Sequence, residues 1–131
     1  TAVSGGAPAV TREVMLRGLD RPWDLAFAPT GELFFTERAG GVRVRLRDGR
    51  IVRYPNPGDF VAQDQSGMLG LALDPAFATN RFLYVYMAST LGGTTANRVV
   101  RWRVSDDFGA LEARTDIVTG IAYGNGGAHS G

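Results

Sequence analysis

The sequence has no cysteine and no lysine, and its only histidine is His129. The absence of cysteine excludes disulfide bonds, thiol catalysis and cysteine-ligated metals. One histidine without any cysteine also argues against a zinc site. A hydrolase triad has little support, because the chain lacks a Gly-x-Ser-x-Gly motif and only two residues follow the histidine.

Long apolar runs and an excess of one charge are also missing. No apolar stretch reaches the roughly 18 residues that a membrane-spanning helix requires. The formal net charge is +1, so no strong field attracts nucleic acid or an anionic membrane. All 14 basic residues are arginines. Those at 43, 45 and 47 and at 101 and 103 alternate with apolar residues, which is typical of solvated outer strands. We expect neither a nucleic-acid partner nor a membrane span.

Glycine and proline are abundant, with 18 and 6 residues spread along the chain, and this indicates many short elements joined by turns. In the first half, the pattern predicts strands over Trp23–Pro29, Glu32–Glu37, Val42–Arg47 and Arg50–Tyr54. Thr30-Gly31 and Asp48-Gly49 are hairpin turn signals between them. A further short strand is predicted over residues 13–19, after a flexible N-terminus of residues 1–12.

The second half of the chain repeats this order. Strands are predicted over Gly67–Asp74, Phe82–Met87, Asn97–Val104 and Ala113–Val118, with one helical turn at most, at Pro75–Thr79. Pro29 and Pro75 end equivalent strands and lie 46 residues apart. A four-stranded repeat of about 40–50 residues is typical of a propeller blade. The alternative is a β-sandwich of about seven short strands.

We therefore predict an all-β chain that supplies about two four-stranded blades of a β-propeller. Blade 1 would comprise residues 20–57 and blade 2 residues 62–120, with residues 121–131 as a loop into a third blade. Propellers typically need about 4 to 8 blades to close. The strand Phe82–Met87 is apolar on both faces and must be covered on both sides. The rest of the propeller or other chains would cover these faces, and residues 13–19 would close the last blade.

Polar residues recur at the starts of the predicted innermost strands, at Trp23-Asp24, Gln65 and His129. Innermost strands surround the propeller axis, so these side chains should converge at one end of the central channel. The amide of Gln65 suits a sugar hydroxyl, but it could equally cap backbone groups in a turn. For Asp24 we expect a side chain that holds the neighbouring loop, and for Trp23 a place in the core.

Three collinear stretches resemble one enzyme family. Residues 65–75 (QSGMLGLALDP) and 80–88 (NRFLYVYMA) resemble the second-blade signature of the soluble pyrroloquinoline-quinone (PQQ)-dependent sugar dehydrogenases, the glucose/sorbosone dehydrogenase family. Residues 19–44 resemble its first blade, and the terminal HSG at 129–131 resembles the start of its His-x-Gly-Gly-Arg-Leu motif. The matches together resemble the N-terminal portion of a six-bladed propeller.

The resemblance implies an enzyme that oxidises aldoses at the anomeric carbon to lactones, with hydride transfer to PQQ and an external electron acceptor. His129 matches the family's general base, and Gln65 matches a residue that hydrogen-bonds the sugar. PQQ and calcium are the family's cofactors, but their ligands are expected downstream of Gly131, so the isolated chain should be inactive. A periplasmic or extracellular location is expected, and the small, flexible start TAVSGGAPAV agrees with export.

Two features depart from the family pattern. The terminal motif stops at Gly131, and Ala128 stands before the histidine, where some relatives carry a polar or acidic group that could orient the ring. The competing hypothesis is a non-catalytic propeller module for binding or scaffolding.

Overall fold

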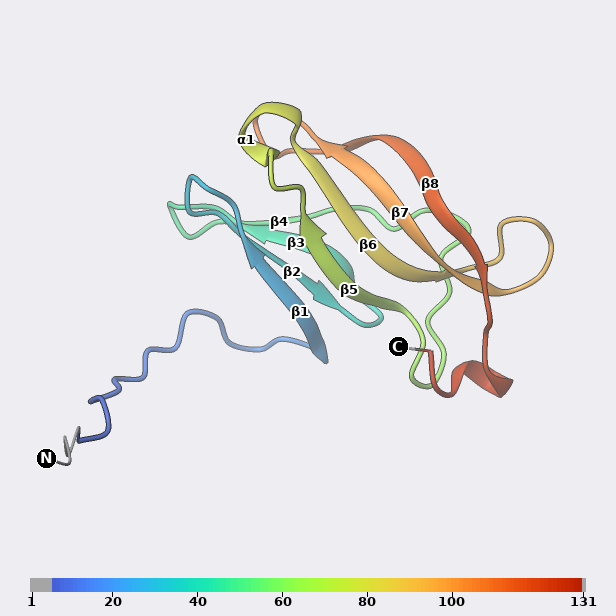
Figure 1. The fold of residues 1–131 in the computed structure, drawn as a ribbon, viewed down its shortest axis with the longest axis horizontal. Coiled ribbons are helices and arrows are strands. Elements are labelled where there is room, and N and C mark those ends of the chain that lie inside the picture. The colour runs from blue at the N-terminus through green and yellow to red at the C-terminus, as the bar shows by residue number, and fades with distance from the viewer. Residues whose placement is uncertain (1–5, 131) are drawn as a thin grey trace, which may run out of the picture.

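The computed structural model describes residues 6–130, which form two four-stranded antiparallel sheets and one short helix (Figure 1). Blade 1 contains β1 (Pro22–Phe27), β2 (Leu33–Glu37), β3 (Gly41–Arg45) and β4 (Ile51–Arg53). Blade 2 contains β5 (Met68–Leu73), α1 (Phe77–Asn80), β6 (Phe82–Ser89), β7 (Ala96–Val104) and β8 (Leu111–Ile121). The short 3₁₀ turn Asn125–Gly127 follows β8.

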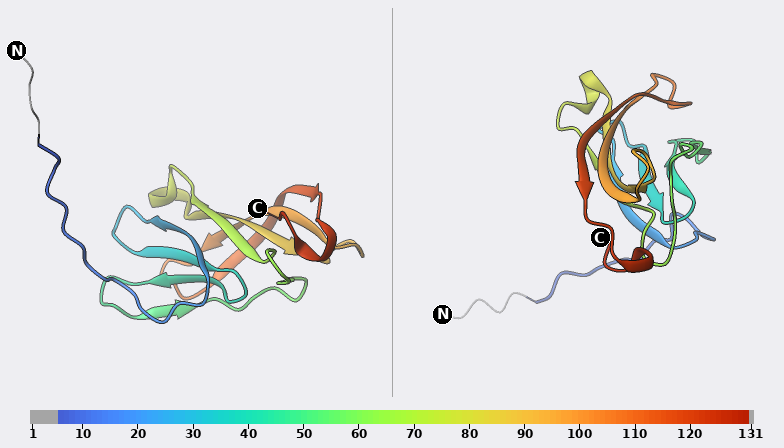
Figure 2. Two further views of the ribbon diagram at one scale, coloured as in Figure 1. Left: turned by 90° about the horizontal axis from the view of Figure 1, so that it is seen from below. Right: turned by 90° about the vertical axis from the view of Figure 1, so that its right-hand side faces the viewer.

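The sheet topology matches the predicted blades. In each sheet the strand order follows the sequence, so both sheets are simple meanders without a crossover. A sandwich would instead need strands that return across the sheet by long connections. Figure 1 shows β1 beside β5, and the end-on view in Figure 2 shows the sheets as two layers that face each other. All eight strands predicted within the two blades are present.

The core lies between the two sheets. Phe34 of β2 and Val44 of β3 are fully buried, as are Leu83 and Val85 of β6. The Phe34 ring meets the ring of Phe77, on α1, edge to face at 5.7 Å. Each of these residues comes from a run that is apolar at alternate positions or on both faces, which is why the pattern located the core correctly.

Arg81 ends α1 and joins it to the turn between β7 and β8. Its backbone is left-handed, with φ of 59°, and caps the helix. Its guanidinium lies 4.3 Å over the ring of Phe108 and donates to the carbonyl oxygens of Val104 at 2.9 Å and Ser105 at 2.7 Å. The single helical turn predicted after Pro75 is thus present. The backbone of Arg81 caps it, and the Arg81 side chain connects it to the β7–β8 turn.

Two polar side chains of blade 1 fasten it to the innermost strand of blade 2. The β5–β6 register shifts between Met68 and Leu71, and there the Thr36 hydroxyl donates to the carbonyl of Leu69 at 2.6 Å. The Asp24 carboxylate accepts from the backbone N–H of Leu71 at 2.9 Å. Asp24 therefore holds a neighbouring strand, where the sequence predicted that it would hold a loop.

Four further predictions require correction or comment. Trp23, predicted in the core, is 45% exposed, because its face of β1 has no sheet packed against it within the described residues. Residues 13–19 form no strand, since no strand lies beside them to share hydrogen bonds, and their role in closing a last blade stays a prediction. β8 is longer than predicted because three register shifts keep it paired with β7. Of the N-terminus predicted as flexible, residues 1–5 lie outside the described part.

The outer face of β1 presents a continuous apolar surface. Trp23, Leu25 and Phe27 alternate along the strand, so they share one face, and they are 45%, 59% and 54% exposed. On the opposite side of the molecule, Tyr84 and Tyr86 of β6 are half-buried beside a shallow hollow. Within residues 6–130, no helix is long and apolar enough to cross a membrane.

Candidate active site

The segment 55–67 carries Gln65 and crosses the ends of the blade 2 strands on its way from β4 to β5. We call this segment the strap. Its Asp59 carbonyl accepts from the N–H of Thr90 at 2.8 Å, and its Val61 N–H donates to the carbonyl of Ala88 at 3.1 Å. These bonds place Gln65 at the edge where β5 begins and β6 ends.

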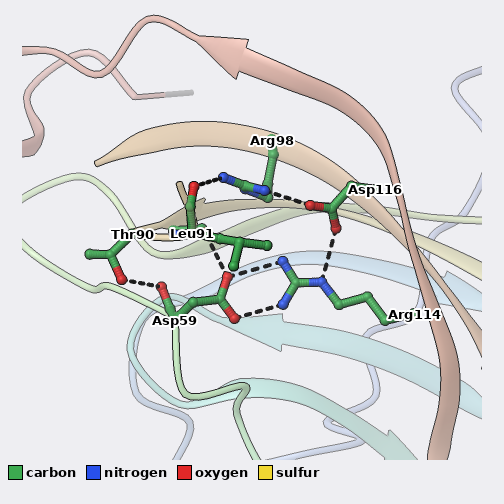
Figure 3. Close-up of polar contacts among 7 residues, drawn as sticks. Asp59, Thr90, Leu91, Arg98, Arg114 and Asp116 are labelled. Atoms are coloured by element: carbon green, nitrogen blue, oxygen red, sulfur yellow. Dashed lines mark hydrogen bonds and ion pairs between the residues drawn. The ribbon is translucent and has the colours of Figure 1, made fainter. Parts of the chain in front are cut away.

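An alternating row of charges fixes the strap to the outer strands (Figure 3). Asp59 receives two hydrogen bonds from the guanidinium of Arg114 on β8, at 2.6 and 3.0 Å. Arg114 also contacts Asp116 at 2.9 Å, and Asp116 pairs with Arg98 of β7 at 2.5 Å. The hydrogen bonds from Arg114 lower the pKa of Asp59 to about 2, against partial burial, and the same bonds raise the pKa of Arg114.

A hydroxyl pair joins the strap to the loop at residues 122–130, which we call the histidine loop. The Ser66 side chain, fully buried, donates to the carbonyl of Gln63 at 2.7 Å and lies 2.9 Å from the hydroxyl of Tyr123. Gly127 packs so closely here that a β-carbon would lie 2.3 Å from the Gln63 carbonyl oxygen, and its φ is +94°. Only glycine fits at this point of the loop.

The two predicted site residues lie together at this edge. The backbone N–H of His129 donates to the side-chain oxygen of Gln65 at 3.0 Å, although 64 residues separate them. Both residues are exposed, so both can be reached from solvent. Of the three positions that the sequence predicted to converge, the structure brings Gln65 and His129 together, whereas Asp24 and Trp23 serve the blade contact and the exposed β1 face instead. That the contact opens onto a central channel stays a prediction.

The sequence analysis gave Gln65 two interpretations, a contact to a sugar hydroxyl or a cap of backbone groups. In the structure its side chain caps a backbone group. The capped group lies in a distant loop and not in its own turn. That leaves the amide nitrogen of Gln65 without a hydrogen bond among residues 6–130. The oxygen of the Gln65 amide therefore makes a structural contact, while its nitrogen is available as a donor at an exposed edge.

Sequence reasoning missed three residues that shape this edge. Arg38, 8% exposed, donates to the backbone carbonyl of Ser66 at 2.9 Å, so it braces the strap from blade 1. Ser66 and Tyr123 form the hydroxyl pair described above. Ser66 lies next to Gln65 in the sequence and could have been considered, but nothing in the local pattern pairs Tyr123 with a residue 57 positions away.

The described residues do not form a site for the family's cofactors. Within residues 6–130, no three His, Asp or Glu side chains gather to hold a metal ion. PQQ carries carboxylates and would need cationic partners; Arg38 donates one N–H to the strap, and its Nε has no partner among the described residues. The row of Arg98 and Arg114 is likewise paired with carboxylates. These residues alone do not gather the ligands that calcium requires.

The chain is similar to known sugar dehydrogenases. Aldose sugar dehydrogenase YliI of Escherichia coli (strain K12) is 34% identical over 106 residues, which are 78% of this chain and 29% of that protein. Quinoprotein glucose dehydrogenase B of Acinetobacter calcoaceticus is 32% identical over 78 residues, 56% of this chain and 16% of that protein. The solved structure of the PQQ-bound aldose sugar dehydrogenase of Streptomyces coelicolor is 26% identical with a TM-score of 0.74, covering 86% of this chain and 34% of that one.

These relatives are much longer than this chain, which spans 34% of the Streptomyces coelicolor structure and 29% of the Escherichia coli protein. The likeness confirms the predicted fold, two adjacent four-stranded blades of a β-propeller. The family model for Glucose / Sorbosone dehydrogenase matches residues 19–131. The chain belongs to the glucose/sorbosone dehydrogenase family.

Proposed function

We propose that the complete gene product is a quinoprotein sugar dehydrogenase that oxidises aldoses at the anomeric carbon to lactones. The observation that carries the proposal is the hydrogen bond between Gln65 and His129 at an exposed edge. It brings a proton acceptor and an amide donor to one place, in a chain of a sugar dehydrogenase family. The isolated chain would be inactive.

His129 would act as the general base. Oxidation of an aldose to a lactone removes a hydride from the anomeric carbon and a proton from its hydroxyl. A histidine side chain can accept a proton near neutral pH, and His129 is the only histidine in the chain. Its exposed position leaves the ring free to meet a sugar. Gln65 would donate from its amide nitrogen to a sugar oxygen.

The remaining components would come from outside the described residues. PQQ would supply the hydride acceptor, with calcium as its companion ion, and an external acceptor would then take the electrons. The rest of the propeller or other chains would cover the apolar faces of β1 and β6. We expect a periplasmic or extracellular location, in keeping with a sugar dehydrogenase of this family.

The test is dye reduction by the complete gene product reconstituted with PQQ and calcium. We expect turnover with aldoses, and a loss of about 100-fold or more in kcat when His129→Ala removes the base. Asn125→Ala, in the same loop but exposed and without a side-chain hydrogen bond, is the matched control and should retain activity.

Two results would contradict the proposal. An absence of turnover with PQQ demonstrably bound would favour the non-catalytic propeller module. Full activity of the His129→Ala variant would show that another group takes the proton.

A further inference from the structure

We propose that Gln65 is a positioning residue, whose amide oxygen holds the backbone of His129 in place and whose amide nitrogen alone faces the substrate. The consequence for catalysis rests on the proposed function, because it assumes that His129 is the base. The contact itself does not rest on it. The two halves of the amide thus have separate tasks, and a substitution can remove the nitrogen while an oxygen remains.

The orientation of the amide follows from chemistry. A backbone N–H can only donate, so the atom of Gln65 that lies 3.0 Å from the His129 nitrogen must be the oxygen. The amide therefore cannot flip without breaking the bond. Its nitrogen points away from His129 as a donor, and the sugar atom opposite it must be an acceptor. Gln65 would select an oxygen with a free lone pair.

The backbone of His129 needs such a hold. Its φ is +54°, in the left-handed region that residues with a β-carbon seldom adopt. Such conformations persist where surrounding contacts fix them, and they gather at functional sites. The N–H captured by Gln65 belongs to the same residue. The bond therefore acts at the point of strain.

The other bonds of the histidine loop do not replace this one. Ser66 meets Tyr123 at the start of the loop, and the Ser130 hydroxyl donates to the carbonyl of Gly127 within it. Among the described residues, the bond from His129 to Gln65 is the only hydrogen bond that joins residues 128–130 to the strap. Without it, residues 128–130 would have no hydrogen bond to the strap among the described residues.

Two variants of the complete gene product separate the two tasks. Gln65→Glu keeps an oxygen for the His129 N–H but has no donor for the sugar. Gln65→Met has a similar length and offers neither. For the glutamate variant we expect a KM about 5- to 10-fold higher, with kcat changed by less than about 3-fold. For the methionine variant we expect kcat to fall about 100-fold as well, because the base is misplaced.

Hydrogen exchange of the histidine loop tests the contact apart from catalysis. It is measured by mass spectrometry on peptides covering residues 124–130, without sugar or cofactor. Exchange should be faster in Gln65→Met than in wild type, and Gln65→Glu should resemble wild type. Gln63→Met, in the same strap with an exposed side chain that makes no hydrogen bond, is the matched control and should change neither exchange nor kinetics.

Equal exchange in wild type and Gln65→Met would overturn the positioning role, whatever the activity. An equal loss of kcat in the glutamate and methionine variants would also overturn it, because the donor would then be the group that matters. If the wild-type protein oxidises no aldose, the proposed function fails, while the exchange result still decides whether Gln65 holds the loop.

Discussion

Thr36 shows how one hydroxyl can join two blades. It is fully buried, donates to the carbonyl of Leu69 in β5 and accepts from the N–H of Asp24 in β1 at 3.2 Å. Valine has the same shape but no hydroxyl. Thr36→Val would therefore leave a buried carbonyl and an N–H without partners, which costs about 1–3 kcal/mol.

We expect Thr36→Val to lower the stability of the complete gene product by that amount, measured by denaturant unfolding. Thr119→Val is the control, because Thr119 is exposed on β8 and makes no side-chain hydrogen bond in the described structure. A control change within about 0.5 kcal/mol is expected. An equal effect of the two substitutions would argue against the bridging role of Thr36.

At the scale of elements, the strap depends on charge pairing. Asp59 has its pKa lowered from 3.8 to about 2, because it accepts hydrogen bonds from Arg114. A carboxyl with a lowered pKa stabilises the fold fully above its ordinary pKa and loses that contribution as the pH falls through its folded value. The strap should therefore weaken between about pH 4 and pH 2.

Asp59→Asn should flatten this acid dependence and lower stability at neutral pH by about 1–3 kcal/mol. The measurement is thermal unfolding of the complete gene product from pH 7 to pH 2. Glu112→Gln serves as the control, since Glu112 is about half exposed and its ion pair with Arg103 is long, at 3.6 Å. An exposed pair of this kind contributes little to stability. A parallel pH dependence for wild type and Asp59→Asn would rule out Asp59 as the responsible group.

The sequence predicted what depends on local pattern and missed what depends on distant contacts. Pro75 marked the end of β5, and the alternation after Gly41 marked β3. No local signal could pair Asp59 with Arg114, 55 residues away. The proximity of Gln65 and His129 could be predicted, because both stand at the starts of repeated units and the repeat places these starts at one edge. The bond between them was not foreseen.

The burial of Trp23 was mispredicted for a different reason. It lies in the largely apolar run Pro22–Phe27, as a core residue often does, but no surface among the described residues covers it. The local sequence pattern indicates that an apolar side chain favours burial, but it does not identify the surface that would bury it.

At the scale of the whole molecule, the 131-residue chain should bind no quinone and oxidise no sugar by itself. Its described residues offer no metal-binding cluster, and the arginines of the charged row are paired with carboxylates. Equilibrium dialysis against PQQ with calcium, and dye reduction with aldoses, measure the two properties. Tight one-to-one binding of PQQ by this chain would show the prediction wrong.

The isolated chain should also self-associate through the apolar face of β1. Trp23, Leu25 and Phe27 form an apolar strip that is exposed to water, and burying it against another copy is favourable. Sedimentation velocity should show oligomers that grow with concentration, and the double substitution Leu25→Thr with Phe27→Thr should reduce them. Leu91→Thr, an equally exposed leucine in a loop, should leave association unchanged. Association unaffected by the β1 substitutions would place the contact elsewhere.

The position of Arg81 at the end of α1 has a practical consequence. Arg81 holds α1, which follows the end of β5, to the β7–β8 turn, whereas Gln65 precedes the start of β5 and contacts His129 there. Anchoring the complete gene product to an electrode through exposed Thr79 or Asp107 would therefore leave the edge that we propose to bind sugar turned toward the sample. A biosensor wired in this orientation should keep its response, whereas attachment near the strap should blunt it.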